Sequence, residues 1–127
     1  MENMMIKIAM PVNGITAANV ADISVNRSFG RSPYFLIYDT GTQESSFLQN
    51  SAAGNPGGAG IKAAQLIVDQ QITALLTPRC GENAANILQS AGITLYQTID
   101  ASVEENINAF INGKLLLLED IHPGFHG

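Results

Sequence analysis

Residues 72–88 read Ile-Thr-Ala-Leu-Leu-Thr-Pro-Arg-Cys-Gly-Glu-Asn-Ala-Ala-Asn-Ile-Leu, a short apolar run that gives way to a helical pattern. The continuous run at 72–76 is typical of a central strand that is covered on both faces. Thr77 and Pro78 end the run, and an apolar stripe with offsets of three and four follows. The stripe consists of Ala84, Ile87, Leu88 and Ala91, and Gly92 closes the helix. A strand followed directly by a helix predicts a unit of an α/β layer protein.

The rest of the second half continues this alternation. A helix is predicted from Ala59, because apolar residues recur on one face at helical offsets. A strand at 93–97 follows, and Ser102 starts a further helix that has acidic residues in its first turn and ends at Gly113. The run at 115–118 is either a last short strand or a packed tail. The stripes expected to be buried are Ile61, Ala64, Ile67 and Val68 in the first of these helices, and Ile107, Phe110 and Ile111 in the second.

The first half of the chain predicts a β-hairpin arrangement instead. Residues 6–12 form a strand that stops at Asn13-Gly14, and 34–39 is an aromatic and β-branched run. A turn at 39–42 leads into a shorter strand at 45–49, which we expect to run antiparallel to the one before it. The whole order predicts a mixed sheet with crossovers in its second half. Ligands of such sheets lie outside the C-terminal ends of the parallel strands. The loops expected there are 11–14, 54–60 and 78–83.

Composition and charge narrow the class of protein. The chain has 127 residues, a natural size for one domain, which we take as 1–127 with a flexible tail from about 115. Its net charge is −5 and its six basic residues are scattered along the sequence, so no nucleic-acid partner is expected. No apolar run is long enough to cross a bilayer, and no secretory signal is visible. We therefore expect a cytoplasmic protein without a membrane partner.

Cys80 is the only cysteine, so an intrachain disulfide is excluded. It follows Arg79 at the mouth of the predicted helix. Unpaired backbone N–H groups, the helix dipole and the guanidinium there all favour a thiolate. Thiolate is the soft ligand that iron–sulfur clusters, zinc and copper select. The alternative is a partly buried thiol that packs as a small hydrophobe. One cysteine cannot enclose a metal alone, and a homodimer that shares a cluster between its subunits is compatible with the sequence.

Two loops are further candidates for binding. The glycine-rich loop at 54–60 opens onto a helix, and its backbone N–H groups can cradle an anion. It fits neither the P-loop nor the dinucleotide fingerprint, and loop glycines also serve turn geometry. In Ser28-Phe-Gly-Arg-Ser-Pro, Arg31 offers a planar fork suited to carboxylate, phosphate or an anionic cluster. The alternative is a surface arginine in a turn.

The last residues contain both histidines of the chain, His122 and His126. They can bind zinc, nickel or copper, but the Pro-Gly between them prevents the helical spacing that would present them together. Incidental histidines in a tail are the alternative. The sequence shows no catalytic carboxylate pair, serine nucleophile elbow or metal-hydrolase motif. Nothing in the residues calls for an enzyme.

Taken together, these segments resemble the dinitrogenase iron-molybdenum cofactor biosynthesis family. The family consists of small domains related to nitrogenase cofactor carriers and to the C-terminal domain of the cofactor-assembly enzyme. No single motif is decisive, but the ordered series covers nearly the whole chain. It comprises 6–13, Ser28-Phe-Gly-Arg-Ser-Pro-Tyr-Phe with Ile37-Tyr-Asp, Asn55-Pro with Gly58-Ala-Gly, Ala63-Ala-Gln-Leu-Ile, 75–83, Ala91-Gly-Ile-Thr-Leu-Tyr, and Val103-Glu-Glu-Asn-Ile with Phe110 and Gly113.

The resemblance implies a ribonuclease-H-like fold, an α/β/α arrangement of three layers around a mixed five-stranded sheet, used without nuclease chemistry. It also implies binding or carrying of an iron–sulfur or molybdenum-containing cluster, exchanged with donor or acceptor proteins. Arginines would offset the cluster charge, and the glycine backbone would donate hydrogen bonds to sulfide or oxo groups. From their chemistry we assign to the cofactor Arg31, Gly57, Gly58, Gly60, Arg79 and Cys80, with Cys80, His122 and His126 as metal ligands.

The chain departs from the family pattern at three positions. Many relatives have a histidine where this chain has Ser28, and another where it has Gly57, whereas Cys80 stands where relatives often have an apolar residue or glycine. The leading hypothesis is a non-enzymatic cluster carrier whose metal contact has moved to Cys80. One alternative is a protein–protein interaction or regulatory module of the same fold that has lost the cofactor. An anion- or nucleotide-binding enzyme ranks last.

Overall fold

The hairpin half and the strand–helix half of the chain share one mixed sheet. The computed structural model describes residues 6–14, 23–119, 121 and 122. The order of the five strands is β3-β2-β1-β4-β6. The hairpin half contains β1 (Lys7–Val12), β2 (Tyr34–Asp39) and β3 (Glu44–Gln49), and β2 is antiparallel to both β1 and β3. On its other side β1 pairs in parallel with β4 (Ala74–Thr77), which pairs in parallel with β6 (Thr94–Gln97).

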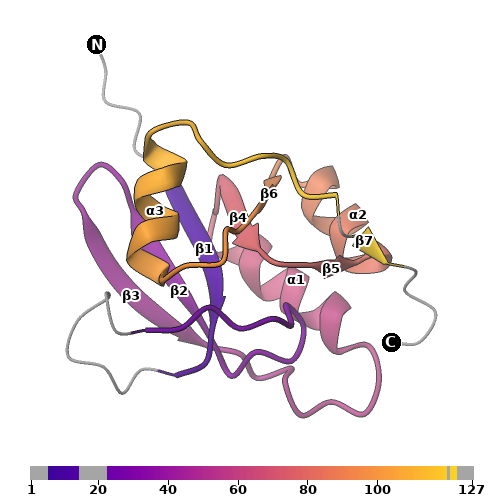
Figure 1. The fold of residues 1–127 in the computed structure, drawn as a ribbon. Coiled ribbons are helices and arrows are strands. Elements are labelled where there is room, and N and C mark those ends of the chain that lie inside the picture. The colour runs from indigo at the N-terminus through magenta and orange to yellow at the C-terminus, as the bar shows by residue number, and fades with distance from the viewer. Residues whose placement is uncertain (1–5, 15–22, 120, 123–127) are drawn as a thin grey trace.

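Helices cover both faces of this sheet. Figure 1 shows α1 (Ala59–Asp69) and α2 (Glu82–Ser90) on one face and α3 (Val103–Ile111) on the other. A second, small sheet pairs β5 (Cys80–Gly81) in parallel with β7 (Ile121–His122). The three-layer α/β/α arrangement with a mixed five-stranded sheet, expected from the resemblance, is confirmed. None of the helices in the described ranges is long and apolar enough to cross a membrane.

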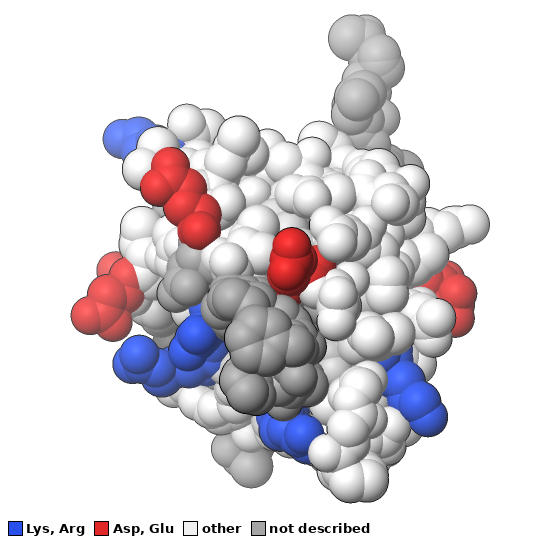
Figure 2. Space-filling view, turned by 90° about the vertical axis from the view of Figure 1, so that its right-hand side faces the viewer, with Lys and Arg blue, Asp and Glu red and all other residues white. Residues whose placement is uncertain are grey.

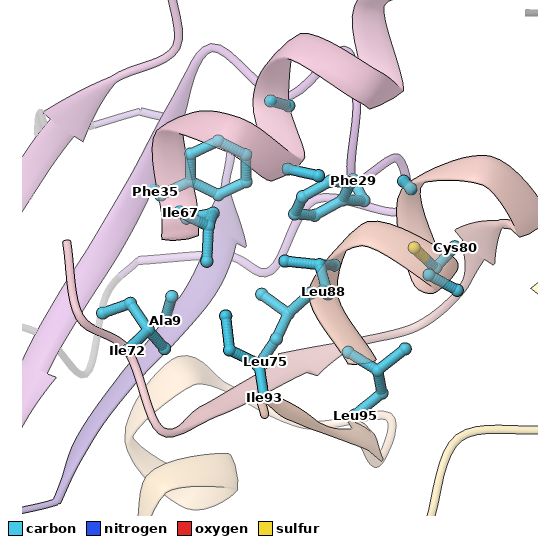
Figure 3. Packing of buried hydrophobic residues seen from close by; sticks show 14 of the residues in the cluster. Ala9, Phe29, Phe35, Ile67, Ile72, Leu75, Cys80, Leu88, Ile93 and Leu95 are labelled. Atoms are coloured by element: carbon cyan, nitrogen blue, oxygen red, sulfur yellow. The ribbon is translucent and has the colours of Figure 1, made fainter. Parts of the chain in front are cut away.

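Strand alternation divides the core into two clusters. Ile8, Met10 and Val12 point toward α3, and Ala9 points toward α1 and α2. This split follows from the two-residue period of β1, because successive side chains of a strand leave opposite faces. Figure 3 shows the cluster under α1 and α2, where Phe29, Leu75 and Leu88 pack together.

The predicted helix stripes are wrong at their ends. Ile61 and Ile111 are 36% and 53% exposed, because they lie in the first turn of α1 and at the last residue of α3, beyond the part of each helix that packs on the sheet. The stripe missed two positions of α3 that are fully buried, Val103 and Asn106. Of these, Asn106 is polar. Its side-chain amide is satisfied by backbone groups of Ile99, Ala101 and Ser102, so the polar side chain is buried with its hydrogen bonds made.

The expected tail from about 115 is packed against the sheet as far as Leu118. The backbone N–H of Gln97 donates to the carbonyl of Leu116 at 2.8 Å, and the N–H of Leu118 donates to the carbonyl of Leu95 at 3.0 Å. Residues 115–118 therefore run antiparallel to β6 and protect that edge of the sheet. A flexible tail beginning at 115 is wrong for these residues, because the outer two leucines, Leu115 and Leu118, are buried. Residues 123–127, which include His126, lie outside the described residues.

Candidate functional site

A pocket of about 560 Å³ lies where the N-termini of α1 and α2 meet the turn at 27–31. Both helices begin at the edge of the sheet where β4 ends, which is where α/β sheets bind their ligands. The lining comes from 27–31, 58–61, 79–81 and 83–84. Two of the three expected rim loops therefore contribute to the pocket, and the loop at 11–14 does not.

The two helices that open onto the pocket lack side-chain caps. The N-cap of α1 is Gly58, in the left-handed conformation with φ 71°, and the N-cap of α2 is Gly81. On the other face of the sheet, α3 has a complete capping box formed by Ser102 and Glu105. The first turn of any helix has backbone N–H groups without intrahelical partners and a partial positive charge. Two uncapped ends at one pocket favour an anionic ligand there.

The turn at 27–31 is anchored in the core by an aromatic side chain. Phe29 is 3% exposed, and its ring centroid lies 5.2 Å from that of Phe35 in the core. The backbone N–H of Ser28 donates to Oδ1 of Asn26 at 2.8 Å, and Oγ of Ser28 accepts a hydrogen bond from the N–H of Arg31 at 3.1 Å. These contacts fix the turn while both of its arginines stay exposed at the pocket.

All three arginines of the chain, Arg27, Arg31 and Arg79, line this pocket. None of the described residues of its lining is Asp or Glu, although the chain has 11 acidic and six basic residues. Figure 2 views the side on which α2 and β7 lie, and most Lys and Arg visible there are in the lower half, whereas the Asp and Glu lie above or at the margins. Arg79 is far from the other two arginines in the sequence, but the three are close together in space. The fold gathers the arginines into a positive pocket.

Cys80 reaches this pocket from inside the core. Its side chain is 1% exposed, and Figure 3 shows the sulfur at the Phe29 end of the cluster. Burial raises the pKa of the thiol from 9.0 to about 12, although a backbone hydrogen bond from Gly81 acts in the opposite direction. The expected thiolate is therefore wrong for this structure, because burial outweighs the helix N-terminus and the guanidinium of Arg79. Cys80 carries a neutral thiol at neutral pH.

The expected metal ligands do not form a described site. Within 6–14, 23–119 and 121–122, no three or more His, Cys, Asp or Glu side chains come together in a way that could hold a metal ion. The backbone of β7 places His122 opposite Gly81, next to Cys80, and His126 lies outside the described residues. Metal ligation by Cys80 with these histidines stays a prediction.

The pocket brings together five of the six residues that the sequence analysis assigned to the cofactor. Arg31, Gly58, Gly60, Arg79 and Cys80 are in the lining, and Gly57, which is exposed and precedes the N-cap of α1, is not. Arg27, Phe29 and Asn83 also line the pocket, although the sequence analysis gave none of them a role of its own. A signal for Arg27 was present, because two of the only three arginines flank Ser28-Phe-Gly.

The fold and the pocket together define a class of protein, namely a small ribonuclease-H-like α/β domain with an arginine-lined pocket at two helix N-termini. The chain belongs to the dinitrogenase iron-molybdenum cofactor family, whose model matches residues 5–113. The family expected from the sequence is therefore confirmed.

Solved structures and a curated sequence are also similar to this chain. The apo form of the orange protein from Desulfovibrio gigas matches with a TM-score of 0.82 and 28% identity, over 94% of this chain and 98% of that one. A NifB-like protein from Thermotoga matches with a TM-score of 0.76 and 31% identity, over 90% of this chain and 94% of that one. An uncharacterized protein of Methanocaldococcus jannaschii is 26% identical over 114 residues, which are 87% of this chain and 90% of that protein.

Proposed function

We propose that this protein binds and carries an anionic metal–sulfur cluster, either iron–sulfur or molybdenum-containing, without catalysing a reaction. The observation that carries this proposal is the gathering of all three arginines at a pocket onto which two uncapped helices open. Guanidinium and backbone N–H groups are the donors that suit sulfide and oxo groups of a negatively charged cluster. Membership of the iron-molybdenum cofactor family supports a cargo of this kind.

The guanidinium and backbone N–H groups of the pocket suit recognition of an anionic cargo by charge and hydrogen bonds. Arg27 and Arg79 offset the charge of the cargo, and the first turn of α1 at 58–60 donates backbone hydrogen bonds. Among the described residues of the lining, Cys80 is the only one with a soft metal ligand. Its thiol contacts a metal only after it loses its proton, and a bound metal promotes that loss. The contact between Cys80 and the cargo therefore forms only when a metal displaces the proton of the thiol.

A cluster carrier also has to meet the proteins that load and unload it. Leu116 and Leu117 are 77% and 62% exposed, on the segment that covers the β6 edge. Exposed leucines of this kind offer an apolar contact for a donor or acceptor protein. We place this protein and its partners in the cytoplasm. The same leucines favour the second candidate function, an interaction module without cofactor.

Anaerobic reconstitution tests the proposal. The protein is incubated with tetrathiomolybdate, or with ferrous iron and sulfide, then desalted, and metal per chain is measured together with visible absorption. We expect stoichiometric metal in the wild type and in Lys114→Gln, an exposed lysine outside the pocket. The double variant Arg27→Gln/Arg79→Gln should lose at least tenfold in affinity. A wild type that retains no metal would refute cluster binding and leave the interaction module.

A further inference from the structure

The three arginines of the pocket do not have the same surroundings. Nη1 of Arg31 donates hydrogen bonds to two backbone carbonyls, those of Ala53 at 3.1 Å and Asn55 at 2.8 Å. Arg27 and Arg79 have no side-chain hydrogen bond or ion pair among the described residues. Arg31 is thus engaged by the protein itself, and the other two guanidinium groups are available to a ligand.

A second side chain connects the same two segments in the reverse direction. Asn50 is 4% exposed, and its Nδ2 donates to the carbonyls of Gly30 at 3.0 Å and Ser32 at 2.8 Å. Its Oδ1 accepts a hydrogen bond from the backbone N–H of Ala52 at 3.1 Å. The turn therefore reaches into the glycine loop through Arg31, and the loop reaches into the turn through Asn50. We call this pair of contacts the interlock.

The interlock sits between the two parts of the pocket that carry its donors. On one side is the turn at 27–31, and on the other is the loop at 50–58, which leads into the left-handed N-cap Gly58 and the first turn of α1. The backbones of Gly30 and Gly60 already touch across this boundary. A change in the interlock therefore changes where the N–H groups of α1 lie relative to the arginines.

We propose that Arg31 is a positioning residue of this pocket, which with Asn50 holds the glycine loop and the N-terminus of α1 in the ligand-binding arrangement, and that Arg27 and Arg79 meet the charge of the ligand. This inference rests on the proposed function for the ligand, but its structural part concerns the free protein. Arg31 acts through the carbonyls of 53 and 55. Lysine is not equivalent there, because its shorter and more flexible side chain does not hold a nitrogen in the fixed position that the planar guanidinium gives Nη1.

The test compares Arg31→Lys, which keeps the charge, with Arg31→Gln, which removes it, and uses Arg27→Gln as a matched arginine variant in the same pocket. The rate of backbone amide hydrogen exchange in the free protein measures directly how well ordered residues 51–58 are. Both Arg31 variants should exchange these amides severalfold faster than the wild type, and Arg27→Gln should not. Unchanged exchange at 51–58 in Arg31→Gln would overturn the proposal.

Tetrathiomolybdate binding at several salt concentrations separates position from charge. Arg31→Lys should bind roughly threefold to tenfold more weakly, with the salt dependence of the wild type, because hydrogen bonds are lost and charge is not. Arg27→Gln should flatten the salt dependence, because it removes a ligand-facing charge. Wild-type affinity in Arg31→Lys would also overturn the positioning role. If the wild type binds neither thiomolybdate nor an iron–sulfur cluster, the proposed function fails, and the exchange measurement still decides whether the interlock exists.

Discussion

Gly30 and Gly60 approach so closely that a Cβ on Gly30 would lie 2.9 Å from both the Cα and the backbone nitrogen of Gly60. The first residue belongs to the turn that carries Arg27 and Arg31, and the second to the first turn of α1. The contact brings guanidinium groups and helix N–H groups to one pocket. It is a contact of backbone with backbone, so no rotation of a side chain can relieve an added methyl group.

Gly30→Ala should therefore move the turn away from α1. We expect a loss of about 1–3 kcal/mol in the free energy of unfolding, the usual effect of overpacking a tight contact. Denaturant unfolding measures this loss, and Gly54→Ala is the control, because a Cβ there meets nothing within 4 Å. Equal stability of the two variants would contradict the close approach.

Cys80 should make the protein less stable at high pH. Its pKa is raised to about 12 by burial, from 9.0, so the unfolded chain ionises first as the pH rises. The folded state then binds more protons than the unfolded state, and stability falls between pH 9 and 12 by about 1.4 kcal/mol per pH unit. The measurement is the difference in unfolding free energy between wild type and Cys80→Ala from pH 7 to 10.5. It should be constant below pH 8, and a difference that stays constant up to pH 10.5 would contradict the burial effect.

Gly81→Asp should separate helix stability from ligand binding. Gly81 has φ −73° and ψ 153°, the extended conformation of an ordinary N-cap, so an aspartate there can accept hydrogen bonds from the first turn of α2. Stability of the free protein should rise by roughly a few tenths of a kcal/mol. Affinity for tetrathiomolybdate should fall at least tenfold, because the same N–H groups are engaged and a negative charge is added.

The control for this variant is Asn86→Asp, which adds the same charge at an exposed position of α2 outside the pocket lining. It should leave thiomolybdate affinity close to that of the wild type. Equal loss in both variants would mean that net charge, rather than the helix N-terminus, governs binding.

Truncation after Glu119 should make Cys80 more reactive. It removes β7, whose Ile121 and His122 pair with Cys80 and Gly81. The backbone beside the thiol then loses its partner strand and opens to solvent, so alkylation by iodoacetamide at pH 8 should be faster than in the full chain. Truncation after His122 keeps β7 and is the control. The same rate in both truncated chains would mean that β7 does not protect the thiol.

The architecture follows from local patterns in the sequence. The run at 72–76, the helical stripe beginning at Ala84 and the hairpin signals around 39–42 each correspond to the observed element. The patterns did not predict burial at the ends of the helices. Ile61 and Ile111 have the spacing of buried residues, but they lie beyond the packed part of their helices. The position of residues 115–118 could not be predicted, because it depends on the free edge of the sheet at β6, which no local pattern encodes.

The candidate site was predictable only in part. Arg31, Arg79 and the glycines attracted notice through their chemistry and their neighbours in the sequence, and they do share a pocket. Arg27 did not, because its role depends on the turn that places it beside residues about 30 and 50 positions away. The gathering of all three arginines in an acidic chain is a property of the folded surface.

Cys80 shows most clearly what the sequence by itself determined and what tertiary structure decided. The sequence determined that a lone thiol follows β4 and precedes an uncapped helix, because strand and helix periods are local properties of the chain. Only the tertiary structure decided its protonation, because packing by residues such as Phe29 and Ala84 excludes water from the sulfur. Burial and through-space charge depend on residues far apart in the sequence, and these two quantities set the chemistry of this pocket.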